Sequence, residues 1–278
     1  MTICIAATCD CSNEPKIILC SDWQASTIVG ASETTFKQRL LRKAWTAMYA
    51  GNASAALGLH SELASRFRGS HPIDDASAIQ SVRGAMNARK KTLADEYIQG
   101  RYGLSYDDFL KIGKERLPGD LYLMAISTIR DMTIGVECIV AGFDGAYPVL
   151  IRGDEQCRVS IRESFTCIGE GEYLASSVLV HRAHDEMSPM NQSLYCVYEA
   201  KRYAERVRSV GKTTSLTIRY RDGSSHLVTA KGRELLSKKF DEYGPKEIGA
   251  IALTDECLRH HSGEPKSSAS PSEGEQAS

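Results

Sequence analysis

The chain has 278 residues, of which 42% are hydrophobic and 25% charged, as in ordinary globular proteins. Its 34 Lys and Arg nearly balance its 35 Asp and Glu, so no chain-wide basic field attracts nucleic acid or an anionic membrane. No apolar run approaches the roughly 18 residues that span a bilayer, and the first residues lack the basic region of a signal peptide. We therefore expect a cytoplasmic protein with reduced cysteines, and neither nucleic acid nor a membrane as its partner.

The first fifty residues contain three runs that are typical of strands. Two apolar runs, at residues 2–7 and 16–20, flank a polar turn and predict a β-hairpin. A third run, at 45–50, ends at Gly51 and Asn52, after which Ala and Leu recur at helical spacing. Asn52 is therefore placed to cap a helix that follows this strand.

The middle of the chain predicts a helix, a polar insertion and a group of strands. The helix is expected at 72–94, because Asp74 and Asp75 would lie in its first turn, where carboxylates interact favourably with the helix dipole. Residues 97–119 are polar and predict an insertion with one short helix at 106–116. Turn residues separate β-rich runs that predict an antiparallel meander at 121–129, 132–142, 147–152 and 156–161.

The last third predicts two helices, a hairpin and a closing helix. A glycine-rich corner at 168–172 leads into the first helix, and Ser188 with Pro189 is typical of the start of the second. Residues 259–278 are rich in Ser, Pro, Glu and Gly and predict a disordered tail. The expected helices span 173–184, about 189–210 and 232–240, and the hairpin strands span 213–219 and 226–229.

The order of these elements indicates the fold class. Groups of strands separated by paired helices favour antiparallel sheets covered by helices over a parallel βαβ arrangement. Two stacked sheets with a helical layer on each outer face would bury every predicted apolar face. The sequence therefore predicts an α+β domain over residues 1–258, a four-layer αββα sandwich of two antiparallel sheets with an insertion at about 97–119.

Thr2 is the position that points most directly to chemistry. Methionine aminopeptidases remove Met1 when the second residue is small, so we expect the mature chain to begin with Thr2. This residue would then carry both a hydroxyl and a free α-amine. The pKa of an α-amine is about 7.7–8.0, so a useful neutral fraction exists near neutral pH and can act as a base toward the hydroxyl.

Three further segments follow Thr2 at characteristic spacing. Residues 21–26 read Ser-Asp-Trp-Gln-Ala-Ser, Lys37 lies fifteen residues after Asp22, and Gly51 lies fourteen residues after Lys37. In this order the segments resemble the family of proteasome β-subunits and HslV peptidases, which are N-terminal-nucleophile (Ntn) hydrolases. The resemblance covers about residues 2–240 and identifies the chain as a bacterial-type proteasome homologue with the αββα Ntn hydrolase fold.

The resemblance implies a role for each of these residues. Thr2 would be the nucleophile, and Lys37 would favour its alkoxide while being kept charged and oriented by Asp22. The amide of Gly51 would donate to the oxyanion of the tetrahedral intermediate. Arg39 is an alternative to Lys37, because residues two apart in a strand share a face.

The chain departs from the family at the third part of the proton-transfer network. The family carries Gly-Ser-Gly where this chain reads Gly169-Glu170-Gly171. Either Glu170 takes the role of that serine or the network is altered. The family's later Asp and Ser fall here near Val207 and Val210, and of the residues there only Ser209 is a possible counterpart.

We therefore expect a self-assembling threonine peptidase that needs no cofactor or metal ion. By the same resemblance, its subunits would form a homo-oligomeric ring or ring-like chamber that admits a polypeptide substrate, and an ATP-dependent unfoldase is a candidate partner. Two alternatives remain: a non-catalytic scaffold of the same fold, and an amidohydrolase that acts on a small amide. A peptidase hydrolyses amides when assembled, whereas the scaffold does not. The size of the substrate distinguishes a peptidase from the small-amide hydrolase.

Overall fold

A computed structural model describes residues 2–22, 24–27, 30–33, 37–68 and 73–245, with only the backbone at 24–27 and 30–33. The compact unit of the chain ends at Tyr243. The tail that the sequence predicts at 259–278 lies outside the described residues.

The first of two five-stranded antiparallel sheets contains the first two and the last two strands of the described chain. Its strand order is β10-β1-β2-β11-β12, so the amino-terminal hairpin of β1 and β2 occupies the middle. The two hairpin strands are buried along their whole length, which agrees with their nearly continuous apolar sequence. The strands are β1 (Cys4–Cys9), β2 (Lys16–Asp22), β10 (Phe165–Ile168), β11 (Thr214–Tyr220) and β12 (Ser225–Leu227).

The second sheet is a meander with the order β5-β6-β7-β8-β9. Every pair of neighbouring strands in it is antiparallel. A separate hairpin pairs β3 with β4. The strands are β3 (Gln24–Thr27), β4 (Gly30–Glu33), β5 (Gln38–Arg42), β6 (Trp45–Gly51), β7 (Val136–Asp144), β8 (Tyr147–Gly153) and β9 (Val159–Arg162).

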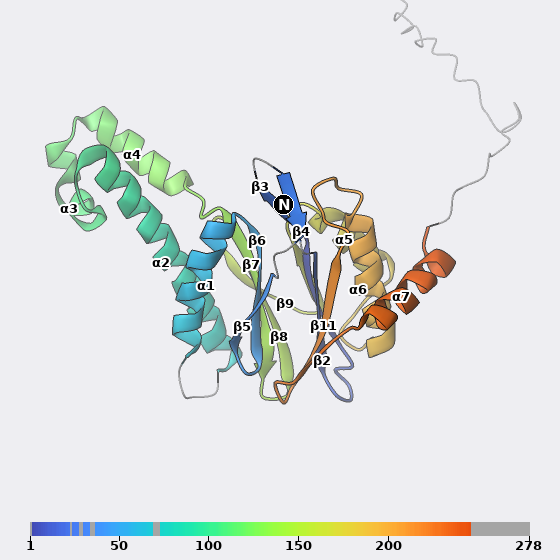
Figure 1. Cartoon of the computed structure of the whole chain (residues 1–278). Coiled ribbons are helices and arrows are strands. Elements are labelled where there is room, and N and C mark those ends of the chain that lie inside the picture. Colours follow the sequence, from blue (N-terminus) through green and yellow to red (C-terminus); the bar gives the residue numbers. More distant parts are fainter. Residues whose placement is uncertain (1, 23, 28–29, 34–36, 69–72, 246–278) are drawn as a thin grey trace, which may run out of the picture. The chain divides into compact units, whose positions relative to one another are not determined.

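Three apolar clusters hold the layers together. Cys4 and Ala6 of β1 belong to a cluster between the sheets, whereas Ile3 and Ile5 belong to one that includes the helices α5 (Glu172–His181) and α6 (Met190–Ala204). This alternation follows from the two-residue period of a strand. The third cluster packs α1 (Ala53–Phe67) and α2 (Asp75–Tyr102) on the meander sheet. Figure 1 shows these helices on opposite outer faces, with α7 (Ala230–Tyr243) beside α6. The α+β class with two antiparallel sheets is confirmed.

The insertion consists of helices joined by short turns, and here one prediction was wrong. Residues 121–129 were predicted as a strand, but they belong to α4 (Gly119–Asp131), while 97–102 complete α2. Together with α3 (Tyr106–Arg116), these helices enclose a small cluster around Phe109 and Ala125. Tyr122, Ala125, Ile126 and Ile129 face this cluster at the spacing of a helix. The short apolar run has the same composition as a buried strand, and the contact with Phe109 favours the helix.

Other boundaries differ slightly from the predictions, and four strands were not predicted. The first helix is capped as expected, since the Asn52 side chain accepts hydrogen bonds from the amides of Ser54 (2.9 Å) and Ala55 (3.1 Å). Pro189 precedes the first helical residue of α6 instead of being that residue. The unpredicted strands β3, β4, β5 and β10 are four or five residues long and too short to show a clear alternation.

The packing of α1 predicts unequal effects of two leucine substitutions on stability. Leu59 is fully buried between α1 and the meander sheet, whereas Leu57 on the same helix is 54% exposed. We expect Leu59→Ala to lower the free energy of unfolding by about 2–5 kcal/mol through lost burial and a cavity. Leu57→Ala should change it by less than about 0.5 kcal/mol. Urea denaturation measures both, and equal effects would contradict the described orientation of the helix.

Candidate active site

Three predicted site residues meet at one end of the two sheets. Thr2 lies just before β1, Asp22 is the last residue of β2, and Lys37 lies just before β5. The Thr2 hydroxyl donates a hydrogen bond to Oδ1 of Asp22 and accepts one from Nζ of Lys37. The same Nζ lies 2.7 Å from Oδ1 of Asp22. The two sheets therefore bring a hydroxyl, an ammonium and a carboxylate into mutual contact.

Asp22 is fully buried, and its carboxylate is saturated with donors. Besides the Thr2 and Lys37 contacts, Oδ1 accepts the amide of Ile3 at 3.1 Å, and Oδ2 accepts the amide of Gly211 at 3.0 Å. A buried charge is costly unless it is paired and hydrogen-bonded. The position of Lys37, which is only 9% exposed, is thus coupled to Asp22, because removal of either partner leaves an unpaired buried charge.

A pocket of about 270 Å³ opens beside Thr2. Gly51 and Glu170, the other two predicted site residues, line it, as does Gly169. Gly169 has a φ of +96°, and a Cβ atom there would lie 2.3 Å from the carbonyl oxygen of Thr2. A residue with a side chain would therefore displace Thr2, so this corner requires glycine.

Gly51 is the last residue of β6 and directly precedes Asn52, the cap of α1. Its φ is +116°, and a Cβ atom would lie 2.5 Å from the carbonyl oxygen of Gly135. This backbone is held in place, because the amide of Asn52 donates to the same oxygen at 2.9 Å. Gly51 thus presents bare backbone to the pocket close to the amino terminus of a helix, a setting suited to stabilising negative charge.

Glu170 and Ser209 contact each other on the edge of this pocket. The Ser209 hydroxyl donates a hydrogen bond to Oε2 of Glu170. The contact joins the Gly-Glu-Gly corner to the segment that follows α6, which are the two places where the chain departs from the family pattern. No direct hydrogen bond from Glu170 to Thr2 is present in the described residues.

Two carboxylates in the pocket wall were not predicted. Glu137 and Glu155 line the pocket with Glu170. Glu137 accepts the amide of Gly169 at 3.1 Å and pairs with Arg152 at 2.9 Å. Arg152 also pairs with Glu172. The signal available in the sequence was a charged residue inside each of two otherwise apolar strands, Glu137 in β7, which has a second charged residue only at its end, and Arg152 in β8.

The structure distinguishes the predicted residues from their alternatives. Lys37, not Arg39, contacts Thr2 and Asp22, and Arg39 contributes instead to the lowered pKa of His60, whose main cause is burial. Cys4 is the thiol near this site, but burial raises its pKa to about 12 despite the opposing charge of Lys37. A thiol with that pKa is protonated and a poor nucleophile at neutral pH.

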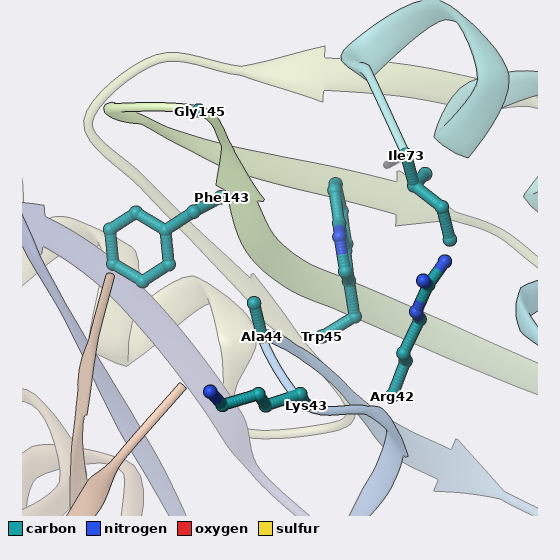
Figure 2. A pocket seen from close by; sticks show the side chains of 7 residues that line it. All are labelled: Arg42, Lys43, Ala44, Trp45, Ile73, Phe143 and Gly145. Atoms are coloured by element: carbon teal, nitrogen blue, oxygen red, sulfur yellow. The ribbon is translucent and has the colours of Figure 1, made fainter. Parts of the chain in front are cut away.

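A second hollow lies at the other end of the meander sheet (Figure 2). Arg42, Lys43, Trp45 and Phe143 line it, near the turns that join β5 to β6 and β7 to β8. Trp45 and Gly51 are the first and last residues of β6, so the two hollows are separated by about 20 Å along this strand. The second hollow therefore plays no part in the chemistry around Thr2.

Comparisons with known proteins give no further assignment of this site. No model of a protein family matches the chain, and no curated protein matches it significantly. Within the described ranges, no group of His, Cys, Asp and Glu side chains is arranged to hold a metal ion. No helix in that part of the chain combines the length and hydropathy needed to cross a bilayer.

This geometry predicts different effects of removing the two neighbouring cations. Lys37→Met should lower turnover by about 10²–10⁴-fold, the range for loss of a positioned proton-transfer group. Arg39→Met should retain turnover within about twofold, because the described contacts of Thr2, Asp22 and Lys37 do not include the half-buried Arg39. Steady-state hydrolysis of a fluorogenic peptide amide compares the variants. If Arg39→Met lowered turnover and Lys37→Met did not, the described register of β5 would not be that of the active protein.

Proposed function

We propose that this protein is an N-terminal threonine hydrolase that cleaves peptide bonds and belongs to the proteasome-like Ntn hydrolases. The observation that carries the proposal is the convergence of the Thr2 hydroxyl with Lys37 and Asp22 beside an open pocket. Two sheets with helices on both outer faces are compatible with the αββα fold of that family. Removal of Met1 would add the free α-amine of Thr2 to the same group.

The first half-reaction forms an ester on Thr2. The Thr2 oxygen attacks the carbonyl carbon of the scissile amide, and its proton passes to the neutral α-amine. The positive charge of Lys37 stabilises the developing alkoxide and disfavours protonation of the amine. Collapse of the tetrahedral intermediate breaks the C–N bond, and the departing nitrogen takes the proton from the α-amine.

The second half-reaction restores the enzyme. A water molecule loses a proton to the α-amine and attacks the ester carbonyl. Collapse of this second intermediate breaks the bond to the Thr2 oxygen, which regains a proton as the acid is released. In both half-reactions the amide of Gly51 donates to the oxyanion, and Glu170 with Ser209 takes the place of the family's Gly-Ser-Gly serine.

The charge of the pocket indicates which substrate side chains it favours. Three carboxylates line it, those of Glu137, Glu155 and Glu170, and no basic side chain is among its lining residues in the described part of the chain. Only Glu137 is paired with an arginine there, through Arg152. A pocket of one sign concentrates ligands of the opposite sign. We therefore propose that substrates with a basic side chain next to the scissile bond are preferred.

This preference is testable with peptides that differ in one side chain. We expect kcat/KM to be about tenfold or more higher for Arg than for Asp before the scissile bond at low salt, with a smaller ratio at high salt because of screening. Glu155→Gln should lower the ratio while leaving the hydrolysis of a Leu peptide within about twofold, because Glu155 contacts neither Thr2 nor Lys37. Equal rates for Arg and Asp peptides would contradict the electrostatic argument.

We also propose that the subunits assemble into a homo-oligomeric chamber, which would restrict access to Thr2 and which an ATP-dependent unfoldase would supply with polypeptide. Large apolar side chains on the outer helices support an association surface. Tyr173 and Val180 of α5 are 81% and 67% exposed, and Leu57 of α1 is also exposed. Tyr173 and Val180 are seven residues apart and lie on one side of α5, and clustered exposed apolar groups are typical of such surfaces.

The nucleophile is tested by substituting Thr2. Thr2→Ala should abolish amide hydrolysis without changing the oligomeric mass, because the hydroxyl is the reacting group and the packing of β1 does not depend on it. Thr2→Ser should retain part of the activity. Peptide hydrolysis, intact mass spectrometry and light scattering are measured on the same samples. Equal turnover in the wild type and Thr2→Ala, or an active assembled chain that keeps Met1, would contradict the mechanism and favour the scaffold reading or another site.

A further inference from the structure

Lys201, which is not among the predicted site residues, is completely buried near the candidate site. Lys201 lies in the last turn of α6, and its side chain is fully buried. Its Nζ donates hydrogen bonds to the carbonyl oxygens of Gly211 at 2.7 Å and Lys212 at 3.0 Å. It also pairs with Glu205 at 2.5 Å. A buried ammonium with three acceptors holds those acceptors strongly, since each would otherwise lose hydration without compensation.

The segment held by Lys201 reaches the carboxylate at the centre of the candidate site. The carbonyl of Gly211 accepts from Lys201, and the amide of the same residue donates to Oδ2 of Asp22 at 3.0 Å. Asp22 in turn contacts both the hydroxyl of Thr2 and the ammonium of Lys37. The ammonium of Lys201 is therefore connected to the reacting group through one backbone residue and one carboxylate.

The same segment also contacts Glu170, which lines the pocket. It runs from Glu205 to Lys212 and contains Ser209, which donates to Glu170. It packs closely against the glycine-rich corner, because a Cβ atom on Gly171 would lie 3.1 Å from Cγ2 of Val210. A displacement of this segment would thus move the donor to Asp22 and the partner of Glu170 together.

We infer that Lys201 is a positioning residue for the proposed hydrolysis, which fixes residues 205–212 so that the Gly211 amide orients Asp22 toward Thr2 and Lys37. The inference rests on the proposed function for its catalytic consequence, whereas the anchoring of the segment is independent of it. Lys201 touches neither the reacting group nor the pocket. Its loss should therefore lower kcat more than it raises KM.

The matched control is Lys16, which occupies the other end of β2. Lys16 is also buried and ion-paired, with Asp10 at 3.1 Å and Glu14 at 3.0 Å. Lys201→Met and Lys16→Met each replace a buried ammonium by an apolar chain of similar length. In Lys201→Met, Glu205 keeps a partner, because Arg202 lies 3.2 Å from its carboxylate. The variant is therefore expected to fold.

Two measurements on the full-length variants test the inference. Hydrogen exchange with mass spectrometry reports the protection of 205–212, and steady-state hydrolysis of a fluorogenic peptide amide reports kcat and KM. In Lys201→Met we expect exchange in 205–212 to become faster and kcat to fall by about 10–100-fold, with KM within about threefold of the wild type. Lys201→Arg, which can donate to both carbonyls, should restore part of both properties. Lys16→Met should change neither.

The outcomes separate the positioning role from the proposed function. Unchanged exchange in 205–212 of Lys201→Met would overturn the inference, as would a kcat no lower than that of Lys16→Met in an active enzyme. A wild type without hydrolytic activity would refute the proposed function. Faster exchange of 205–212 in Lys201→Met would then still support its anchoring by Lys201, and unchanged exchange would overturn that too.

Discussion

The buried carboxylate of Asp22 is the group on which the arrangement at Thr2 depends. It accepts hydrogen bonds from four donors in three parts of the chain: the Thr2 hydroxyl, the Ile3 amide, the Lys37 ammonium and the Gly211 amide. An ionised group removed from water must be compensated by such donors, and their directions then become fixed. The donors that compensate the buried charge of Asp22 therefore also fix the geometry around the Thr2 hydroxyl.

The two sheets supply these donors from distant positions in the sequence. The first sheet brings Thr2 and Asp22 together through the pairing of β1 with β2, and it brings Gly211 close because β11 pairs with the other edge of β2. The second sheet positions Lys37, which directly precedes β5, and Gly51, the last residue of β6. The candidate site therefore exists only when both sheets are packed, which makes it depend on the apolar cluster between them.

Elements that follow from local sequence patterns were predicted, whereas features that depend on tertiary contacts were missed. The β1–β2 hairpin and the capped start of α1 follow from apolar runs and from Asn52. The strand predicted at 121–129 was wrong because a short apolar run does not distinguish a strand from a helix until its partner, here Phe109, is known. Thr2 was named because it follows Met1, and Asp22 and Lys37 were named from the resemblance to the proteasome family; the structure brings the three side chains together. Lys201 was missed because one lysine in a helix gives no sign of burial.

The central claim is that Thr2 is an amino-terminal nucleophile activated by its own amine and by Lys37. Its most direct test is intact and peptide-level mass spectrometry after treatment with an electrophile that reacts with both the hydroxyl and the α-amine of an amino-terminal threonine. The account predicts a chain that lacks Met1 and carries one adduct per subunit, located on Thr2. A folded, assembled protein that retains Met1, or one that lacks Met1 but takes up no adduct at Thr2, would contradict the account.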